Sequence, residues 1–135
     1  MTHSTLDAWH RMIKERDATA LDEVLADDAV FHSPVVHTPQ QGKALTKLYL
    51  SAAIMVLGNA DFHYVREVIG ESDAVLEFTC EIDDIQINGV DMIHFDAEGR
   101  IDDFKVMVRP LKAVNLLHRL MAKTVSYTHL RAHET

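Results

Sequence analysis

One carboxylate is placed in the sequence where acid–base chemistry is possible. Asp91 lies in the mainly apolar run VDMIHF (90–95), and the period-two alternation of a strand puts it on the same side as Ile93 and Phe95. If that side faces the interior, loss of water raises the pKa of the carboxyl and makes it a proton donor or a general acid–base. The alternative is a carboxylate at the end of a strand, facing solvent.

The histidines do not indicate a metal site. Seven of them precede residue 125, and among these seven none of the patterns H-x-H, H-x3-H or H-E-x-x-H occurs, so local structure does not bring two imidazoles to one ion. The single cysteine, Cys80, cannot complete a four-ligand zinc site. We therefore expect no metal and no cofactor.

Composition narrows the class of protein. The chain has 135 residues, of which 47% are hydrophobic and 25% charged, as in one ordinary globular domain. Its formal net charge of −8 repels nucleic-acid phosphates, so we expect no nucleic-acid partner. No run approaches the roughly 18 apolar residues of a membrane span, and the first residues lack the apolar stretch of a signal peptide. With one cysteine, these features predict a cytoplasmic protein without membrane contact.

The last eleven residues differ from the rest. The string VSYTHLRAHET (125–135) has no apolar period and resembles a translated sequencing adapter. Segments of this kind are left out of fold reasoning. We therefore predict one domain over residues 1–124, followed by an artefactual tail over residues 125–135.

The hydrophobic pattern changes from helical to alternating along the chain. Helical spacing predicts two helices before residue 26 and a third after Gly42, with a short strand at 29–34 between them. Period-two alternation then predicts four consecutive antiparallel strands, at 61–69, 73–82, 85–95 and 100–109. Apolar positions after Pro110 predict a terminal helix. Helices followed by an antiparallel sheet make an α+β fold.

Two segments carry a resemblance to a known family. ADDAVFHSPVVHTPQQG (26–42) and VDMIHFDAEGRI (90–101) resemble the nuclear-transport-factor-2-like (NTF2-like) superfamily, and in particular its SnoaL-like and ketosteroid-isomerase-like branches. The resemblance implies a cone in which three N-terminal helices pack on a curved antiparallel sheet, with a short C-terminal helix. It also implies an apolar internal pocket and a homodimer formed through the sheet.

Of three functional positions in ketosteroid isomerases, only one holds the same type of residue in this sequence. Their general base falls on Ser33, which has no usable pKa near neutrality, and their oxyanion tyrosine falls on Trp9, whose indole donates a hydrogen bond but not a proton. Their second donor, a carboxylic acid kept neutral by an apolar site, falls on Asp91. If a histidine replaces the missing base, His37 is the best placed, on the loop expected at the pocket rim. The alternative for His37 is a solvent-exposed imidazole.

The pattern and the resemblance together predict a binding protein for a small apolar or aromatic metabolite. Asp91 would act in cofactor-free isomerase, cyclase or dehydratase chemistry, with His37 as the second catalytic candidate. One alternative is a non-catalytic ligand-binding module, and another is a hydrolase similar to limonene epoxide hydrolases, which requires an arginine between two inward aspartates. The residues predicted to contact the ligand are Trp9, Ser33, Tyr49, Phe78, Phe104 and Val106.

Overall fold

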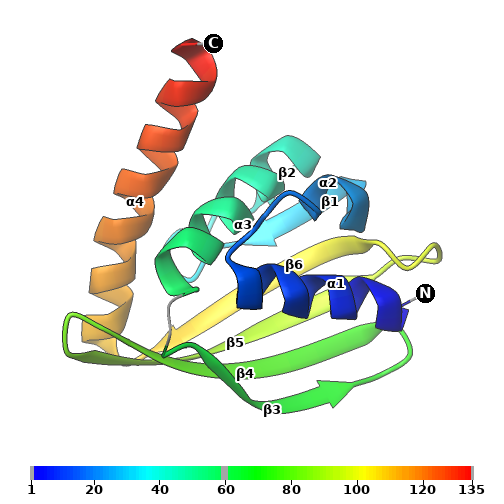
Figure 1. Cartoon of the computed structure of the whole chain (residues 1–135), viewed down its shortest axis with the longest axis horizontal. Coiled ribbons are helices and arrows are strands. Elements are labelled where there is room, and N and C mark those ends of the chain that lie inside the picture. The colour runs from blue at the N-terminus through cyan, green and yellow to red at the C-terminus, as the bar shows by residue number, and fades with distance from the viewer. Residues whose placement is uncertain (1, 59–60, 135) are drawn as a thin grey trace.

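Helices cover one face of a single sheet in the computed structural model (Figure 1). The structure describes the backbone of residues 2–58 and 61–134, and the side chains of residues 4–58 and 61–126. In chain order the elements are α1 (Thr2–Glu15), α2 (Leu21–Val24), β1 (Leu25–His32), β2 (Gln40–Gln41), α3 (Lys43–Leu57), β3 (His63–Ile69), β4 (Asp73–Ile82), β5 (Ile85–Phe95), β6 (Ile101–Arg109) and α4 (Leu111–Glu134). The α+β class is as predicted, and two strands separate α3 from the first two helices.

The sheet has six strands in the order β2-β1-β6-β5-β4-β3. The four consecutive strands β3 to β6 pair antiparallel, as the alternation predicts. The prediction of a wholly antiparallel sheet is wrong at β1, which pairs parallel with β6, Phe31 lying beside Phe104. Whether two strands far apart in sequence pair parallel or antiparallel depends on the connection between them. The local hydrophobic period gives no information on that connection.

Alternation places the apolar side chains of the central strands on the inner face, under the helices. In β4, Leu76, Phe78 and Cys80 are buried, and in β6 Phe104 and Val106 are buried. The outer face carries polar groups among partly exposed apolar ones. One face of the sheet therefore packs on a core and the other does not.

Two close contacts shape the inner face of the sheet and the start of α3. At Gly89 on β5, an added Cβ would lie 2.3 Å from Cζ of Phe78, so the absence of a side chain lets that ring cover the strand. At the start of α3, the carbonyl oxygen of Ala29 accepts the backbone N–H of Gly42 at 2.8 Å and the hydroxyl of the buried Thr46 at 3.0 Å. These two bonds fix α3 against β1.

The terminal helix is longer than predicted. α4 runs for 24 residues and rises past the other helices (Figure 1), so the expectation of a short helix is wrong. The segment after Thr124 contains neither glycine nor proline, and without a helix breaker the first turns propagate into it. Where the side chains are described, the buried residues of α4 are Ala113, Leu116 and Leu117, all well before Thr124.

We predict that removal of residues 125–135 leaves the melting temperature within about 1 °C of the full chain, because the buried residues of α4 precede the cut and surface changes are worth about 0.5 kcal/mol or less. Thermal unfolding followed by circular dichroism measures this. A fall of several degrees would show that the tail contributes to the fold. The side chains of 127–135 lie outside the described residues.

Candidate functional site

A small apolar cavity lies between the helices and the inner face of the sheet. Its volume is about 40 Å³, room for roughly three water molecules. α1, α3 and α4 form one side, and the sheet and the loop after β1 form the other. The lining residues are Trp9, Ile13, Phe31, Ser33, Pro34, Val35, Leu50, Ala53, Ile54, Leu57, Phe62, Phe78, Asp91, Phe104, Val106, Leu117 and Met121.

Aromatic rings form two walls of this cavity. On one side Trp9 packs on Phe104 with ring centroids 5.0 Å apart, and Phe31 lies 6.3 Å from Phe104. On the other side Phe62 stacks on Phe78 at 5.0 Å. Rings in such contacts lose little side-chain entropy and hold a defined shape, so the walls are suited to a flat apolar molecule.

Asp91 is buried at the cavity, with 5% of its surface exposed. Its Oδ2 accepts a hydrogen bond of 2.6 Å from the hydroxyl of Tyr64, and the Tyr64 oxygen accepts one of 2.9 Å from the indole N–H of Trp9. These two hydrogen bonds link α1, β3 and β5. Trp9 and Tyr64 are 55 positions apart in sequence, and Tyr64 and Asp91 are 27 positions apart.

The donor and acceptor in each of these two hydrogen bonds follow from the groups involved. An indole nitrogen only donates, so the Tyr64 oxygen must be the acceptor from Trp9, and the Tyr64 proton is left to point at Asp91. The second carboxyl oxygen, Oδ1, accepts no hydrogen bond from the described residues. Since no fully buried side-chain oxygen among them is unpartnered, Oδ1 opens onto the cavity that Asp91 lines.

The protein environment shifts two pKa values. Loss of water on burial raises the pKa of Asp91 from 3.8 to about 7, and the hydrogen bond from Tyr64 opposes that rise. The pKa of Tyr64 is raised well above 10, first by burial of its hydroxyl and then by the charge of Asp91. Near neutral pH the Asp91 carboxyl is therefore present in both forms, while Tyr64 keeps its proton.

Five of the residues predicted to contact a ligand line the cavity: Trp9, Ser33, Phe78, Phe104 and Val106. Tyr49 is not among the lining residues; it stacks on Phe31 at a centroid distance of 5.6 Å, one ring away from the cavity. His37 is exposed on the loop between β1 and β2, also outside the lining. The structure therefore brings five of these residues together with Asp91 and leaves Tyr49 and His37 apart from them.

Ser33 supplies the other polar group of the lining. Its Oγ accepts the backbone N–H of Val35 at 3.1 Å, which fixes the side chain at the end of β1. Its own proton has no acceptor among the described residues. A ligand oxygen in the cavity could accept that proton.

Tyr64 is the functional residue that the sequence analysis missed. The register of β3 against β4 shifts between Tyr64 and Arg66, so simple alternation does not give the direction of Tyr64. A weaker signal is present, because Tyr64 is the one tyrosine in the predicted strand 61–69. Only the pairing of Tyr64 with Phe78 places its ring on the inner face.

Two other kinds of site find no support among the described residues. No group of three His, Cys, Asp or Glu side chains converges to hold a metal ion. The hydrolase alternative needs an inward arginine, but none lines the cavity; Arg66 and Arg109 instead bind Glu77 and Asn88 on the outer face. No described helix is long and apolar enough to cross a membrane.

The fold and the site define a class: an α+β domain whose helices and curved sheet enclose an apolar cavity around one buried acid. The model of the SnoaL-like domain family matches residues 6–104, and the chain belongs to this family. A search of curated proteins gave no match.

Solved structures agree with this assignment. A steroid delta-isomerase from Pseudomonas aeruginosa is 35% identical, with a TM-score of 0.89 over 96% of this chain and 94% of that one. An uncharacterised protein from Silicibacter pomeroyi is 28% identical, with a TM-score of 0.85 over 98% and 94%. The epoxide hydrolase/cyclase-like enzyme SalBIII shares the fold at 18% identity, with a TM-score of 0.64 over 80% and 90%.

We predict that the buried carboxyl makes stability fall as pH rises. The folded protein holds the Asp91 proton up to a pKa of about 7, against 3.8 ordinarily. It therefore binds more protons than the unfolded chain between these values, and stability is lost as pH rises from about 4 to about 7. At about 1.4 kcal/mol per pKa unit, the upper limit is about 4 kcal/mol.

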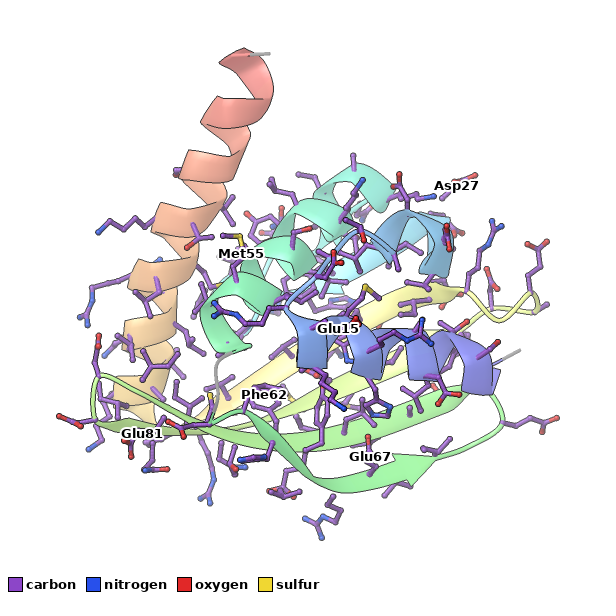
Figure 2. All side chains as sticks on the ribbon, viewed as in Figure 1. Glu15, Asp27, Met55, Phe62, Glu67 and Glu81 are labelled. Atoms are coloured by element: carbon purple, nitrogen blue, oxygen red, sulfur yellow. The ribbon has the colours of Figure 1, made fainter. Side chains whose placement is uncertain are left out.

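Urea unfolding of Asp91→Asn at several pH values measures this contribution. The free energy of unfolding of Asp91→Asn should rise relative to that of the wild type between pH 4 and 7, and the difference between the two should stay constant above that range. Asp27→Asn is the control, because the Asp27 side chain is 97% exposed (Figure 2). Parallel curves for wild type and Asp91→Asn throughout would contradict the raised pKa.

Proposed function

We propose that this protein binds a small, mainly apolar molecule in the internal cavity and performs cofactor-free acid–base chemistry on a carbonyl group of that molecule. The observation that carries the proposal is the state of Asp91. One of its oxygens accepts the hydroxyl of Tyr64, which in turn accepts the indole N–H of Trp9. The other oxygen opens onto an apolar cavity, and the pKa of the carboxyl is raised to about 7. A carboxyl in that condition both donates and accepts a proton near neutrality.

Asp91, Tyr64 and Trp9 each have a role in this chemistry. When Asp91 is protonated, Oδ1 donates to the carbonyl oxygen and stabilises the enol or enolate that forms. When Asp91 is ionised, the same oxygen can take a proton from a carbon next to the carbonyl. In both states Tyr64 bonds to Oδ2, and Trp9 fixes Tyr64, so the carboxyl keeps one orientation.

The cavity sets a condition on the ligand. At about 40 Å³ it is well below the roughly 300–1,000 Å³ of most ligand sites. Half-buried side chains at its edge, including Ile13, Phe62 and Met121, therefore have to move outward when a ring-sized molecule enters. This favours compact ligands over extended ones.

One similar protein of solved structure supports the same class of chemistry. The steroid delta-isomerase is 35% identical over nearly the whole chain. In this chain Ser33 stands where ketosteroid isomerases have their base, so Asp91 would have to move the proton itself or with a further group such as His37. We keep His37 as a catalytic candidate and Tyr49 as a ligand contact, each of which requires the loop or the Phe31 ring to shift.

A non-catalytic binding module is the second candidate. Asp91 is the only Asp, Glu, His, Lys or Arg that lines the cavity among the described residues. A cavity with one ionisable group can bind a carbonyl compound without turning it over.

Hydrogen–deuterium exchange distinguishes the two functions without knowledge of the substrate. We predict that the wild type accelerates exchange of the protons next to the carbonyl of 2-indanone in D₂O, followed by NMR. Asp91→Asn should lower that rate about 100-fold or more, while binding of 2-indanone, read from the thermal shift, persists.

Asp27→Asn should exchange like the wild type. Binding without accelerated exchange in the wild type would favour the non-catalytic module. Equal exchange by wild type and Asp91→Asn would contradict the role of Asp91.

We also propose that two copies of the chain pair through the outer face of the sheet. No helix covers that face in Figure 1, and a groove of about 460 Å³ crosses it, with Val68 and Met107 62% and 49% exposed. The same face carries both signs of charge, in Arg66 and Arg109 on one hand and Glu77 on the other. A patch with both features can be self-complementary across a two-fold axis.

We predict that Met107→Glu converts a dimer into a monomer, because a carboxylate in the apolar part of this face must lose its hydration when two copies pair. Sedimentation velocity measures the mass. Met55→Glu is the matched control, because Met55 is 57% exposed on α3 and away from the sheet (Figure 2). A monomeric wild type, or dimers of both variants, would rule out this interface.

A further inference from the structure

A second hollow lies on the surface next to the internal cavity. Its volume is about 490 Å³, and it lies where the end of α1, the end of α3 and the start of β3 meet. We call it the vestibule. Its lining residues are His10, Ile13, Lys14, Arg16, Gly58, Phe62, His63 and Tyr64.

Two side chains separate the vestibule from the cavity. Ile13 and Phe62 line both hollows, and both are only half-buried. Figure 2 shows Phe62 just before β3, close to the sheet. Tyr64 also connects the two, because its ring lines the vestibule while its hydroxyl bonds to Asp91. A molecule that displaces Phe62 would reach from the vestibule to the carboxyl.

The charge of the vestibule is opposite to that of the chain as a whole. The chain carries a formal −8 with histidine counted as neutral, yet the described lining residues include Lys14, Arg16 and two histidines and no acidic residue, which is two positive charges on the same count. Local positive charge in an acidic protein concentrates small anions at that point.

Two of the four basic residues are already engaged. His10 bonds to Glu67 at 2.5 Å. Arg16 follows α1 with a φ of 52° and donates to the carbonyl oxygen of Met55 at 2.9 Å, near the end of α3. Arg16 therefore has a structural role.

Lys14 is the group available to a ligand. Its side chain is exposed and forms no hydrogen bond or ion pair with the described residues. His63 pairs with Thr79 of β4 and also lines another hollow with Asp61 and Glu81, so its imidazole lies on the outer side of the sheet. One free cation matches a monoanion better than a dianion, so a carboxylate fits better than a phosphate.

We propose that the vestibule is a carboxylate-binding subsite, and that the ligand of this protein is a small acid whose apolar body enters the cavity while its carboxylate stays at Lys14. The proposal rests on the proposed function, since it assigns a substrate class to the same site. A charge placed in the apolar cavity would lose its hydration and face Asp91. A charge left in the vestibule keeps water and gains a cation.

The test compares two molecules of the same shape, 3-phenylpropanoate and 3-phenylpropanamide. Trp9 is the one tryptophan of the chain and lines the cavity, so its fluorescence reports entry. We expect the wild type to bind the acid about ten-fold more tightly than the amide at low salt, a preference that weakens as salt is added. In Lys14→Gln the two should bind about equally.

Two controls complete the experiment. Lys112→Gln removes one exposed charge on α4 and should keep the preference of the wild type. Ala53→Phe fills the cavity from α3 and should abolish binding of both molecules. Far-ultraviolet circular dichroism of each variant confirms folding.

Three outcomes would overturn the subsite, and they separate it from the proposed function. If acid and amide bind the wild type equally, or if the preference survives in Lys14→Gln, the subsite is wrong while ligand entry stands. If the acid still binds to Ala53→Phe, the vestibule is an adventitious anion site. If neither molecule alters Trp9 fluorescence and neither stabilises the protein, the subsite fails together with cavity binding.

Discussion

The interior of this protein is organised around one buried carboxyl. Asp91 lies on the inner face of β5 with 5% of its surface exposed, and a charge there is disfavoured unless it is neutralised or hydrogen-bonded. Both happen: the pKa rises to about 7, and the hydroxyl of Tyr64 bonds to Oδ2. That bond depends on the pairing of Tyr64 with Phe78, which puts the tyrosine on the inner face, and the hydrogen bond from the indole of Trp9 requires α1 to lie across the sheet.

The apolar and the polar residues around this carboxyl have different roles in the cavity. Aromatic walls formed by Phe104, Phe31, Phe62 and Phe78 exclude water and shape the cavity, while Asp91 and Ser33 place polar groups in it. Low polarity strengthens each hydrogen bond made there. Phe62 lines both the cavity and the vestibule. Its position therefore affects the entry of a ligand, the shape of the cavity and the contact between the cavity and the basic vestibule.

Much of the fold and part of the site could be predicted from local pattern. The bounds of β4 and β5, and the side of β5 that Asp91 shares with Ile93 and Phe95, follow from alternation, which depends only on neighbouring residues. That this side faces the interior is decided by the packing of the helices on the sheet. The parallel pairing of β1 with β6 depends on a crossover that alternation does not record. The length of α4 follows from the absence of a breaker, which an analysis based on apolar period overlooks. Tyr64 was missed because a bulge interrupts the period at that point.

The sequence by itself determined which residue could be an acid, which strand carries it and which apolar residues surround it, because strand periodicity is a local property. The resemblance in 26–42 and 90–101 added the family. Only the tertiary structure decided that Tyr64 and Trp9 hold this acid, that Tyr49 and His37 lie outside the cavity, and that a basic hollow adjoins it. These relations join side chains from separate elements, and their distances are set by how helices pack on the sheet rather than by their positions in the chain.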